Sequence, residues 1–421
     1  MMIKQYFKQA LQMLKESPLV STISILGTAL SIAAIMVVIL IYQIQLAAYS
    51  PEIRRERMLY INATQSQAKD SNGMRNRGSM STEVVKECFY ALETPEAVTA
   101  IASDKRPISL PGKRLYKEYS IKSTDHYFWK VFDFHFLKGR AFSEADFQSG
   151  IRTAVINDRL AYELFETTDV VGQTVSLDFM HYTICGVVKE VSNAATDAYA
   201  DIWLPYTTDE NLLPVRHSEG IPGEFNVCIL AKKKGDFEAI RNELERRKAQ
   251  YNANKIEYEV GFLEGTLTRM DIAMGSTGFK RVKPSEFLTE TGALLLFLLL
   301  VPALNLSGVA QSSVQRRRSE MGVRKAFGGT NRKLLFQILC ENLVITCIGG
   351  IIGFAFSFLL LLACRSFLLP NEPMLTMDML LQPATLLIAL LFVLLMNISS
   401  AFFPAFRISR QPVVDSLKEI E

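Results

Sequence analysis

Long stretches without charge alternate with polar stretches along this chain of 421 residues. Asp, Glu, Lys and Arg are absent from windows of 35, 25, 23 and 28 residues, at positions 17–51, 291–315, 342–364 and 379–406. An α-helix rises about 1.5 Å per residue, so about 20 apolar residues cross a hydrocarbon core about 30 Å thick. Buried helices of large soluble proteins rarely avoid charge over such lengths. The pattern therefore predicts four transmembrane helices.

The first window is too long to be the core of a secretion signal, which has about 7–15 apolar residues before a small-residue cleavage site. We therefore expect it to be a retained anchor. Ahead of it, residues 1–16 place apolar side chains on one helical face, with Lys4, Lys8 and Lys15 mostly away from that face. This pattern predicts a short amphipathic helix lying on the membrane, and a frayed polar tail is the alternative.

Basic residues in the short connecting segments predict the orientation. The N-terminal segment carries three lysines, the stretch 316–333 carries seven Lys or Arg, and the last segment begins with Arg407 and Arg410. The loop 365–378 holds one Arg against two acids. We expect both termini and the 316–341 link to face the cytoplasm. Residues 52–290 then lie outside.

In the outer segment, predicted strands and helices alternate as in a mixed α/β domain. Alternating and helical patterns predict strands at TAVIN (153–157), FNVCILAKK and IEYEVGF, a hairpin from QTVSLDF and YTICGVVKEV, and helices at DRLAYELF and DFEAIRNELERRKAQY. The polar stretch 64–80 is expected to be a flexible loop. This rhythm suggests small split βαβ sheets.

Together these patterns predict a membrane protein of the α+β class. Four transmembrane helices are expected, with a large extracytoplasmic mixed α/β domain inserted between helices 1 and 2. The predicted parts are an amphipathic helix (1–16), helix 1 (17–51), the outer domain (52–285), helix 2 (286–315), a cytoplasmic coupling helix and turn (316–333), helix 3 (334–364), a short outer loop (365–378), helix 4 (379–406) and a cytoplasmic tail (407–421).

The sequence offers no catalytic, cofactor or metal site. Its four histidines are scattered at no metal-ligand spacing, and no nucleophile motif is present. Three cysteines fall in the outer segment, an odd number that indicates no disulfide framework and leaves one bridge open. The stretch GGTNRK (328–333) lacks the spacing of a phosphate-binding loop, and LSGVAQ (306–311) lies within a span. An ATPase would therefore be a separate chain.

Two other classes of membrane protein are alternatives. An ion-coupled carrier usually places ionisable residues inside its spans, whereas these spans hold only neutral polar residues such as Asn305 and Asn397. A receptor that signals to a cytoplasmic partner without ATP is the main alternative. A receptor of this size should carry a cytoplasmic output domain, yet only 15 residues follow Phe406.

The basic link stands out because the whole chain has a formal charge of only +3. A helix from Gln315 to Phe327 is expected to end at Gly328-Gly329, since glycine accepts the left-handed cap. Lipid anchoring alone, at about 1 kcal/mol per basic residue, would need fewer charges. We therefore favour docking to a partner protein. The predicted coupling residues are Arg316, Arg317, Arg318, Glu320, Met321, Gly322, Val323, Arg324, Lys325, Ala326, Phe327 and Gly328.

Small residues four apart predict where the spans pack. Gly27 and Ser31 form such a pair in the first span, and Gly349 and Gly353 form another in the third. Close backbone approach at such pairs drives helix association in lipid. The alternative is that glycine is simply common in membrane helices.

Two parts of the chain resemble one family. FLKGRAFSEADF, AVINDRLAYELFETTDVVGQTVSL and YTICGVVKEV resemble the periplasmic core domain of MacB-type ABC permeases. The link resembles the FtsX-like pattern Arg-Arg-x-Glu-Ile-Gly-x-Arg-(Arg/Lys)-Ala-x-Gly, with Met321 in place of the branched residue and Glu341 following. FPAFRISRQPVVDSLK is similar to the family's ending, and Asn305 matches an asparagine of its second span.

The resemblance implies a non-catalytic permease subunit of an ABC transporter in the bacterial inner membrane, working by mechanotransmission. A separate cytoplasmic ABC ATPase would bind ATP and Mg, and this chain would bind no cofactor. Efflux, lipoprotein release or regulation of the cell envelope would suit such motion. The implied partners are the ATPase, a second copy or a related permease, a periplasmic adaptor or envelope protein, and membrane lipids. No nucleic acid is expected.

Overall fold

The structure is a computed structural model that describes residues 18–69, 75–110, 117–212, 221–298, 300 and 331–364, with isolated positions between 387 and 398. The described residues fall into two compact units. The helical unit contains the chain up to Ile44 and from Ser285 onward, and the outer unit runs from Gln45 to Pro284. The predicted segments 1–16, 316–328, 365–378 and 407–421 lie outside the described residues.

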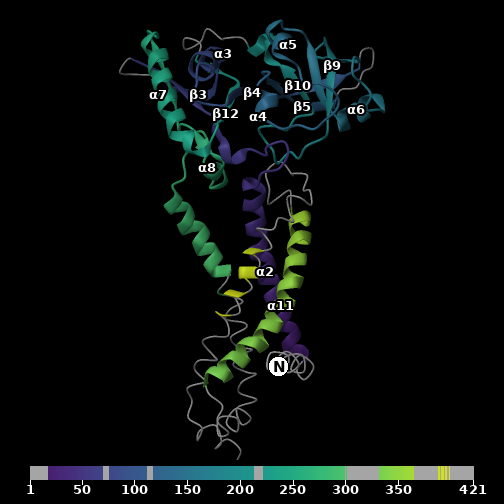
Figure 1. The fold of residues 1–421 in the computed structure, drawn as a ribbon, viewed down its shortest axis with the longest axis vertical. Coiled ribbons are helices and arrows are strands. Elements are labelled where there is room, and N and C mark those ends of the chain that lie inside the picture. The colour runs from purple at the N-terminus through teal and green to yellow at the C-terminus, as the bar shows by residue number, and fades with distance from the viewer. Residues whose placement is uncertain are drawn as a thin grey trace, which may run out of the picture. The chain divides into compact units, whose positions relative to one another are not determined.

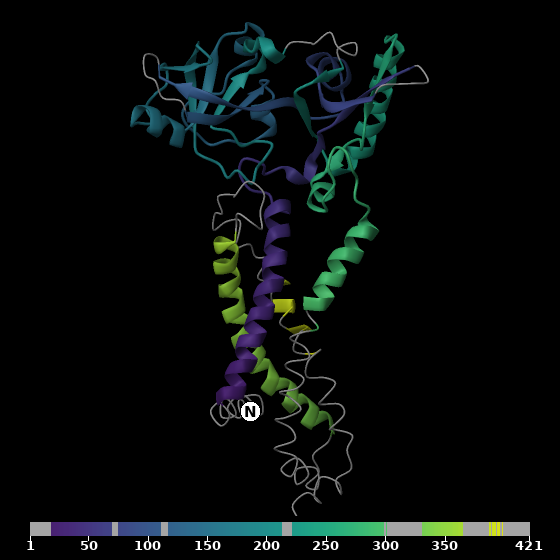
Figure 2. The same ribbon diagram turned by 180° about the vertical axis from the view of Figure 1, so that it is seen from behind.

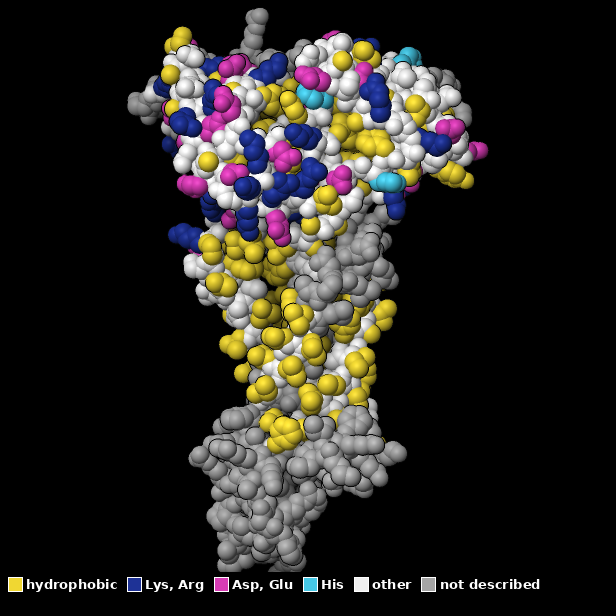
Figure 3. Space-filling view, viewed as in Figure 1, with side chains coloured by type: hydrophobic (Ala, Val, Ile, Leu, Met, Phe, Trp, Pro, Cys, Tyr) yellow, Lys and Arg dark blue, Asp and Glu magenta, His cyan; other side chains and the backbone are white. Residues whose placement is uncertain are grey.

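The helical unit contains α2 (Pro18–Leu46), a helix over 284–298 and α11 (Asn331–Ala363). Within the described part, the stretches Ser21–Leu46 and Leu343–Ala363 are long and apolar enough to cross a membrane, with mean hydropathies of 2.6 and 2.4. Hydrophobic side chains cover much of these helices (Figure 3). The other two predicted spans fall largely on residues that are not described, so the count of four stays a prediction.

Neutral polar residues inside α2 are satisfied by the helix itself. Thr28 Oγ1 donates to the carbonyl of Ser24 at 2.7 Å, and Ser31 Oγ donates to the carbonyl of Gly27 at 2.9 Å. A hydroxyl without a partner in hydrocarbon would cost several kcal/mol, on the order of 4–8. These bonds make the hydroxyls compatible with a membrane span.

The outer unit is built on a mixed sheet whose main path runs β13-β2-β3-β12-β4-β5-β10-β7-β9-β6 (Figures 1 and 2). The pairs β5–β10 and β7–β9 are parallel, and the other pairs on this path are antiparallel. The strands are β1 (Met58–Ile61), β2 (Thr64–Ala68), β3 (Arg75–Met80), β4 (Ala97–Ser109), β5 (Lys117–Thr124), β6 (Phe136–Gly139), β7 (Thr153–Asn157), β8 (Thr174–Leu177), β9 (Met180–Val188), β10 (Ile202–Pro205), β11 (Pro222–Gly223), β12 (Phe225–Leu230), β13 (Tyr258–Phe262) and β14 (Leu267–Thr268).

Short helices and turns connect these strands, and α7 is the longest helix described in the outer unit (Figure 1). The helices are α3 (Thr82–Val84), α4 (Phe128–Val131), α5 (Glu144–Gln148), α6 (Asp158–Phe165), α7 (Phe237–Ala253) and α8 (Arg269–Ala273). The tighter or wider turns are η1 (Arg55–Arg57), η2 (Val85–Tyr90), η3 (Tyr206–Thr208), η4 (Glu210–Leu212) and η6 (Lys234–Asp236).

Two hydrophobic cores divide the outer unit into lobes. In the first, which we call the α7 lobe, Ile240 and Leu244 of α7 pack with Phe89 and with Ile229 of β12. In the second, the α6 lobe, buried residues of α6, β5 and β7–β10 pack together around Leu160. Strand β4 joins the lobes, because its first half pairs with β12 and its second half with β5.

Most of the predicted elements of the outer domain are confirmed. TAVIN is β7, DRLAYELF is α6, the QTVSLDF–YTICGVVKEV pair is the β8–β9 hairpin, and the remaining two strands and the long helix are β12, β13 and α7. The flexible loop predicted over 64–80 is wrong. There β2 and β3 pair with each other, and β2 also pairs with β13.

Candidate functional site

The predicted coupling element, Arg316 to Gly328, lies outside the described residues. Its helix, its turn and its docking role stay predictions. The functional geometry that the structure describes lies instead at the helix contacts of α2 and at the point where α2 ends.

The helix-packing glycines of α11 lie close against α2. A Cβ added at Gly353 would stand 2.5 Å from the carbonyl oxygen of Ala29, and one at Gly349 would stand 3.0 Å from Thr28. Both are closer than ordinary contacts, so only glycine permits this approach without a shift. On α2 the contacts come from Ile25, Thr28 and Ala29, whereas Gly27 and Ser31 are half-buried.

The C-terminal end of α2 is held by two arginines from distant parts of the outer unit. Arg55 Nη1 donates to the carbonyls of Gln45 at 3.3 Å and Ala47 at 2.8 Å. Arg269, at the start of α8, donates its Nε to the same Gln45 carbonyl at 2.7 Å. The last carbonyls of a helix have no partner within it and carry partial negative charge. Two cations therefore satisfy and stabilise this helix end.

Acidic and phenolic groups offset these buried cations. Arg55 is only 1 % exposed; its Nε lies 2.5 Å from Glu52 Oε2, and its Nη2 donates to the Tyr49 hydroxyl at 2.7 Å. Burial alone would lower the pKa of Arg55, but Glu52 and Tyr49 outweigh it and the pKa lies above its ordinary value. Asp197 lies 3.9 Å from Arg269 Nη1, and burial followed by the charge of Glu52 raises the pKa of Asp197.

The loop between β9 and β10 brings the α6 lobe to this helix end. The carbonyl of Ala194 accepts a bond of 3.4 Å from Arg55 Nη2, and Asp197 of the same loop faces Arg269. We call Glu52, Arg55, Asp197, Arg269 and the Gln45 carbonyl the α2 anchor. The α2 anchor thus ties one helix end to segments from three regions of the chain.

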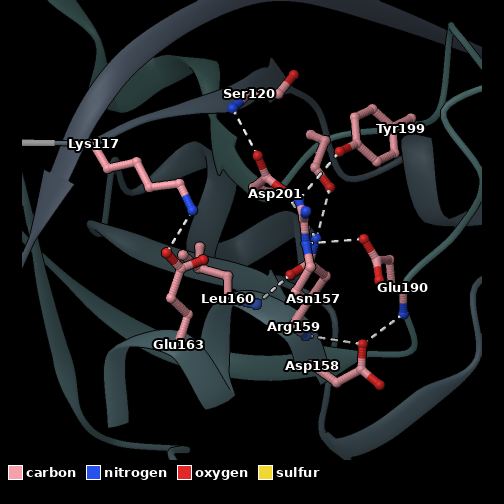
Figure 4. A network of polar contacts seen from close by, with 11 residues as sticks. Lys117, Ser120, Asn157, Asp158, Arg159, Leu160, Glu163, Glu190, Tyr199 and Asp201 are labelled. Atoms are coloured by element: carbon pink, nitrogen blue, oxygen red, sulfur yellow. Dashed lines mark hydrogen bonds and ion pairs between the residues drawn. The ribbon is translucent and has the colours of Figure 1, made fainter. Parts of the chain in front are cut away.

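A second polar network holds both ends of that loop (Figure 4). Arg159 of α6 lies 2.9 Å from Glu190 at the loop's start and 2.7 Å from Asp201 at its end. Asp201 also accepts from the backbone N–H of Ser120 and from the side-chain amide of Asn157. The loop is therefore fixed to α6, β5 and β7, and its contacts at the α2 anchor are fixed with it.

These clusters are suited to mechanical connection rather than to chemistry. Their carboxylates and guanidinium groups bond mainly one another and backbone carbonyls. Among the described residues no group of three or more His, Cys, Asp and Glu lies in an arrangement that would hold a metal ion. The six cysteines are all described, and no disulfide joins any of them.

Sequence reasoning missed the α2 anchor. The run EIRRER directly after the first span resembles an ordinary charged surface, and Arg269 and Asp197 lie far away in the sequence. One local signal was available, since Glu52 and Arg55 form an acid–base pair three residues apart immediately beyond an apolar helix.

Two family models together match most of the chain. The MacB-like periplasmic core domain matches residues 21–247, and the FtsX-like permease C-terminal domain matches residues 292–413. The chain belongs to the FtsX/MacB family of ABC permeases. The resemblance noted from residues 136–191 and from the basic link is confirmed by these matches.

This permease is similar to several curated proteins. It is 26% identical over 220 residues to the uncharacterized ABC transporter permease YknZ of Bacillus subtilis, covering 52% of this chain and 51% of YknZ. It is 22% identical to the uncharacterized ABC transporter permease YvrN of the same organism, and the match covers 98% of this chain and 99% of YvrN. It is 27% identical to the macrolide export ATP-binding/permease protein MacB of Neisseria gonorrhoeae, and this match covers 54% of this chain and 34% of MacB. The chain thus spans about half of YknZ and a third of MacB.

Proposed function

We propose that this permease couples ATP hydrolysis by a separate cytoplasmic ATPase to movement of its outer unit. Membership of an ABC permease family supports an ATPase partner. The observation that carries the proposal is the α2 anchor, in which Arg55 and Arg269 both bond the Gln45 carbonyl. Gln45 lies in the last turn of α2 and is the first residue of the outer unit, so we expect a shift of α2 to displace that unit.

The proposed sequence of events begins on the cytoplasmic side. Two ATPases binding ATP and Mg close and displace the coupling helices at Arg316–Gly328 of a permease dimer or of a pair of related permeases. The spans carry that displacement to the outer units on the periplasmic side of the inner membrane. This chain itself performs no catalysis in the proposal.

The work done by the outer unit belongs to one of three classes. Expulsion of a periplasmic molecule, release of a lipoprotein and regulation of a cell-envelope protein all require an outer unit that moves with ATP. A periplasmic adaptor or envelope protein is then a further partner. The receptor alternative is not favoured, because the chain belongs to a permease family.

Charge reversal in the coupling element tests the proposal. We expect Arg324→Glu with Lys325→Glu to abolish permease-dependent stimulation of the ATPase that co-purifies with the chain. Spin labels at Phe179 and Ile352, in a background without the native cysteines, should also lose their ATP-dependent change in distance. The reason is that a groove complementary to the basic coupling element is acidic, so it would repel the introduced glutamates.

Arg407→Glu with Arg410→Glu is the matched control, since it makes the same change of charge in the tail predicted to be cytoplasmic. The control should keep stimulation and movement. Full stimulation and movement in the Arg324 and Lys325 variant would contradict the proposal, as would purification without any ATPase.

A further inference from the structure

Exposed apolar side chains lie next to the two arginines of the α2 anchor. Ile53 is 44% exposed and lies two residues before Arg55, and Met270 is 54% exposed and directly follows Arg269. Phe279, in the segment that leads from α8 to the next helix, is 52% exposed. Each is an apolar group that the outer unit leaves in contact with its surroundings.

The segment carrying Phe279 is folded into a defined projection. The backbone N–H of Val282 donates to Ser276 Oγ at 2.9 Å, and Thr277 and Lys280 form a β-bridge. A Cβ at Gly278 would stand 2.6 Å from the Ala63 Cβ, so this glycine lies tight against the body of the outer unit. The neighbouring Phe279 is therefore held outward by structure and is not a side chain of a loose loop.

Basic side chains accompany the apolar ones. Lys280 and Lys283 are exposed, and Arg54 is half-buried beside Ile53. Figure 3 shows Lys and Arg side chains gathered on the outer unit near α8. We call Ile53, Arg54, Met270, Phe279, Lys280 and Lys283 the collar. Glu286 and Glu290 follow in the next helix and offset part of this positive charge.

The membrane surface must pass close to the collar. Arg55 and Arg269 bond Gln45, the second-last residue of the apolar helix α2, and so they hold Ile53 and Met270 near that helix end. At the other end of the outer unit's sequence, directly after the collar, the helix beginning at 284 leads into the uncharged window that starts at Thr291. The eight helical residues 284–291 rise about 12 Å, and a headgroup layer is about 5–8 Å thick, so Lys283 lies within about two headgroup-layer thicknesses of that window.

This combination of side chains matches the chemistry of a lipid interface. Phe and aliphatic side chains of surface-bound segments enter the boundary between headgroups and acyl chains, and lysines place their apolar stems along lipid while their ammonium groups meet phosphates. Isolated apolar groups separated by basic ones form no broad apolar patch of the kind that docks a folded protein.

We propose that the collar is a lipid-binding surface, which seats the outer unit on the phospholipid headgroups of the leaflet where α2 ends. Ile53, Met270 and Phe279 enter the interface, and Lys280 and Lys283 bind lipid phosphates. The inference needs only that α2 and the helix after Pro284 cross the membrane. It does not depend on coupling to an ATPase.

The test measures depth in the bilayer with the full-length chain and without ATP. Phe279→Trp and, as the control, Phe179→Trp are reconstituted into phosphatidylethanolamine–phosphatidylglycerol vesicles containing a lipid that is spin-labelled near its headgroup. Phe179 is 94% exposed at the β8–β9 turn, remote in sequence from the collar. Quenching of Trp129 and Trp203 in the parent chain gives the background.

We expect lipid quenching of the Phe279→Trp variant to exceed that of the Phe179→Trp variant severalfold. Adding Lys280→Glu and Lys283→Glu should remove most of that excess in vesicles rich in phosphatidylglycerol. The exposed pair Lys105→Glu and Lys138→Glu should not. Equal lipid quenching of the two tryptophan variants would overturn the proposal, as would protection of the Phe279→Trp variant from both lipid and aqueous quenchers, which would mean that a protein covers the site.

Discussion

Lys122 is a buried cation of the outer unit that forms no ion pair within 4 Å among the described residues. Its side chain on β5 is 4% exposed, and its Nζ donates to Ser103 Oγ at 2.9 Å. Burial lowers its pKa, and the more distant charge of Asp197 only partly opposes this. An ammonium group out of water without a close carboxylate destabilises the folded state.

The pH dependence follows from the direction of that shift. Between the lowered pKa of folded Lys122 and about 10.4 in the unfolded chain, the unfolded state binds more protons, so this residue makes stability rise with pH. We expect Lys122→Met to flatten that rise and to stabilise the outer unit at pH 7 by about 1 kcal/mol.

Thermal unfolding between pH 7 and 10 checks both effects, with exposed Lys105→Met as the control. A Lys122→Met variant whose stability keeps the parent's slope with pH would show that Lys122 stays charged in the folded protein.

At the scale of elements, the crossing of α2 and α11 depends on two glycines. Gly353→Ala places a methyl group 2.5 Å from the Ala29 carbonyl, so the helices must separate. We expect a loss of about 1–3 kcal/mol, the usual cost of overpacking, read as a lower melting temperature in detergent micelles.

Gly292→Ala is the matched control, because a Cβ at Gly292 meets nothing within 4 Å. Both changes gain the same helix propensity of about 1 kcal/mol. The difference between the two variants therefore isolates the contact, and equal melting temperatures would mean that the crossing tolerates a wider separation.

Strands rich in apolar and β-branched residues were predictable, and the polar strand β2 was not. In β7 every residue of TAVIN is buried, and the apolar run with its β-branched residues shows this directly. In β2 the inward positions are Thr64 and Ser66, at 2% and 1% exposure, so the buried face carries hydroxyls. The sequence of β2 therefore lacks the apolar residues that predict a strand.

At the scale of the whole molecule, one shared strand and one loop connect the lobes of the outer unit. Strand β4 pairs with both lobes, and the β9–β10 loop brings Ala194 and Asp197 of the α6 lobe to the α2 anchor. The two lobes are therefore expected to follow α2 together.

Arg269→Met tests that expectation. The change removes a donor from the Gln45 carbonyl and the cation facing Asp197, so we expect a loss of about 1–3 kcal/mol in stability. The ATP-dependent change in distance between labels at Phe179 and Ile352 should become smaller while ATPase stimulation persists.

Arg241→Met serves as the control, since Arg241 bonds Thr266 and, within the described part of the chain, makes no hydrogen bond to α2. Undiminished movement in the Arg269→Met variant would show that Arg55 alone suffices to hold the helix end.

Long-range pairing explains why this part of the molecule could not be predicted. Gln45 and Arg269 are 224 positions apart, and the acceptor on Gln45 is a backbone carbonyl that leaves no trace in residue type. The spans and the coupling element could be predicted at all because their signals are local: an absence of charge, or a dense run of it. The coupling element and two of the four spans stay predictions.

A backbone acceptor at Gln45 also decides where chimeric permeases can be joined. If outer units are exchanged at Leu46, the last residue of α2, the Gln45 carbonyl comes from one permease and the two arginines that bond it come from the other. Their positions then need not match. A fusion point at least one turn before Gln45, with the matching 269–284 segment transferred as well, would keep the end of α2 and the arginines that bond it from the same permease.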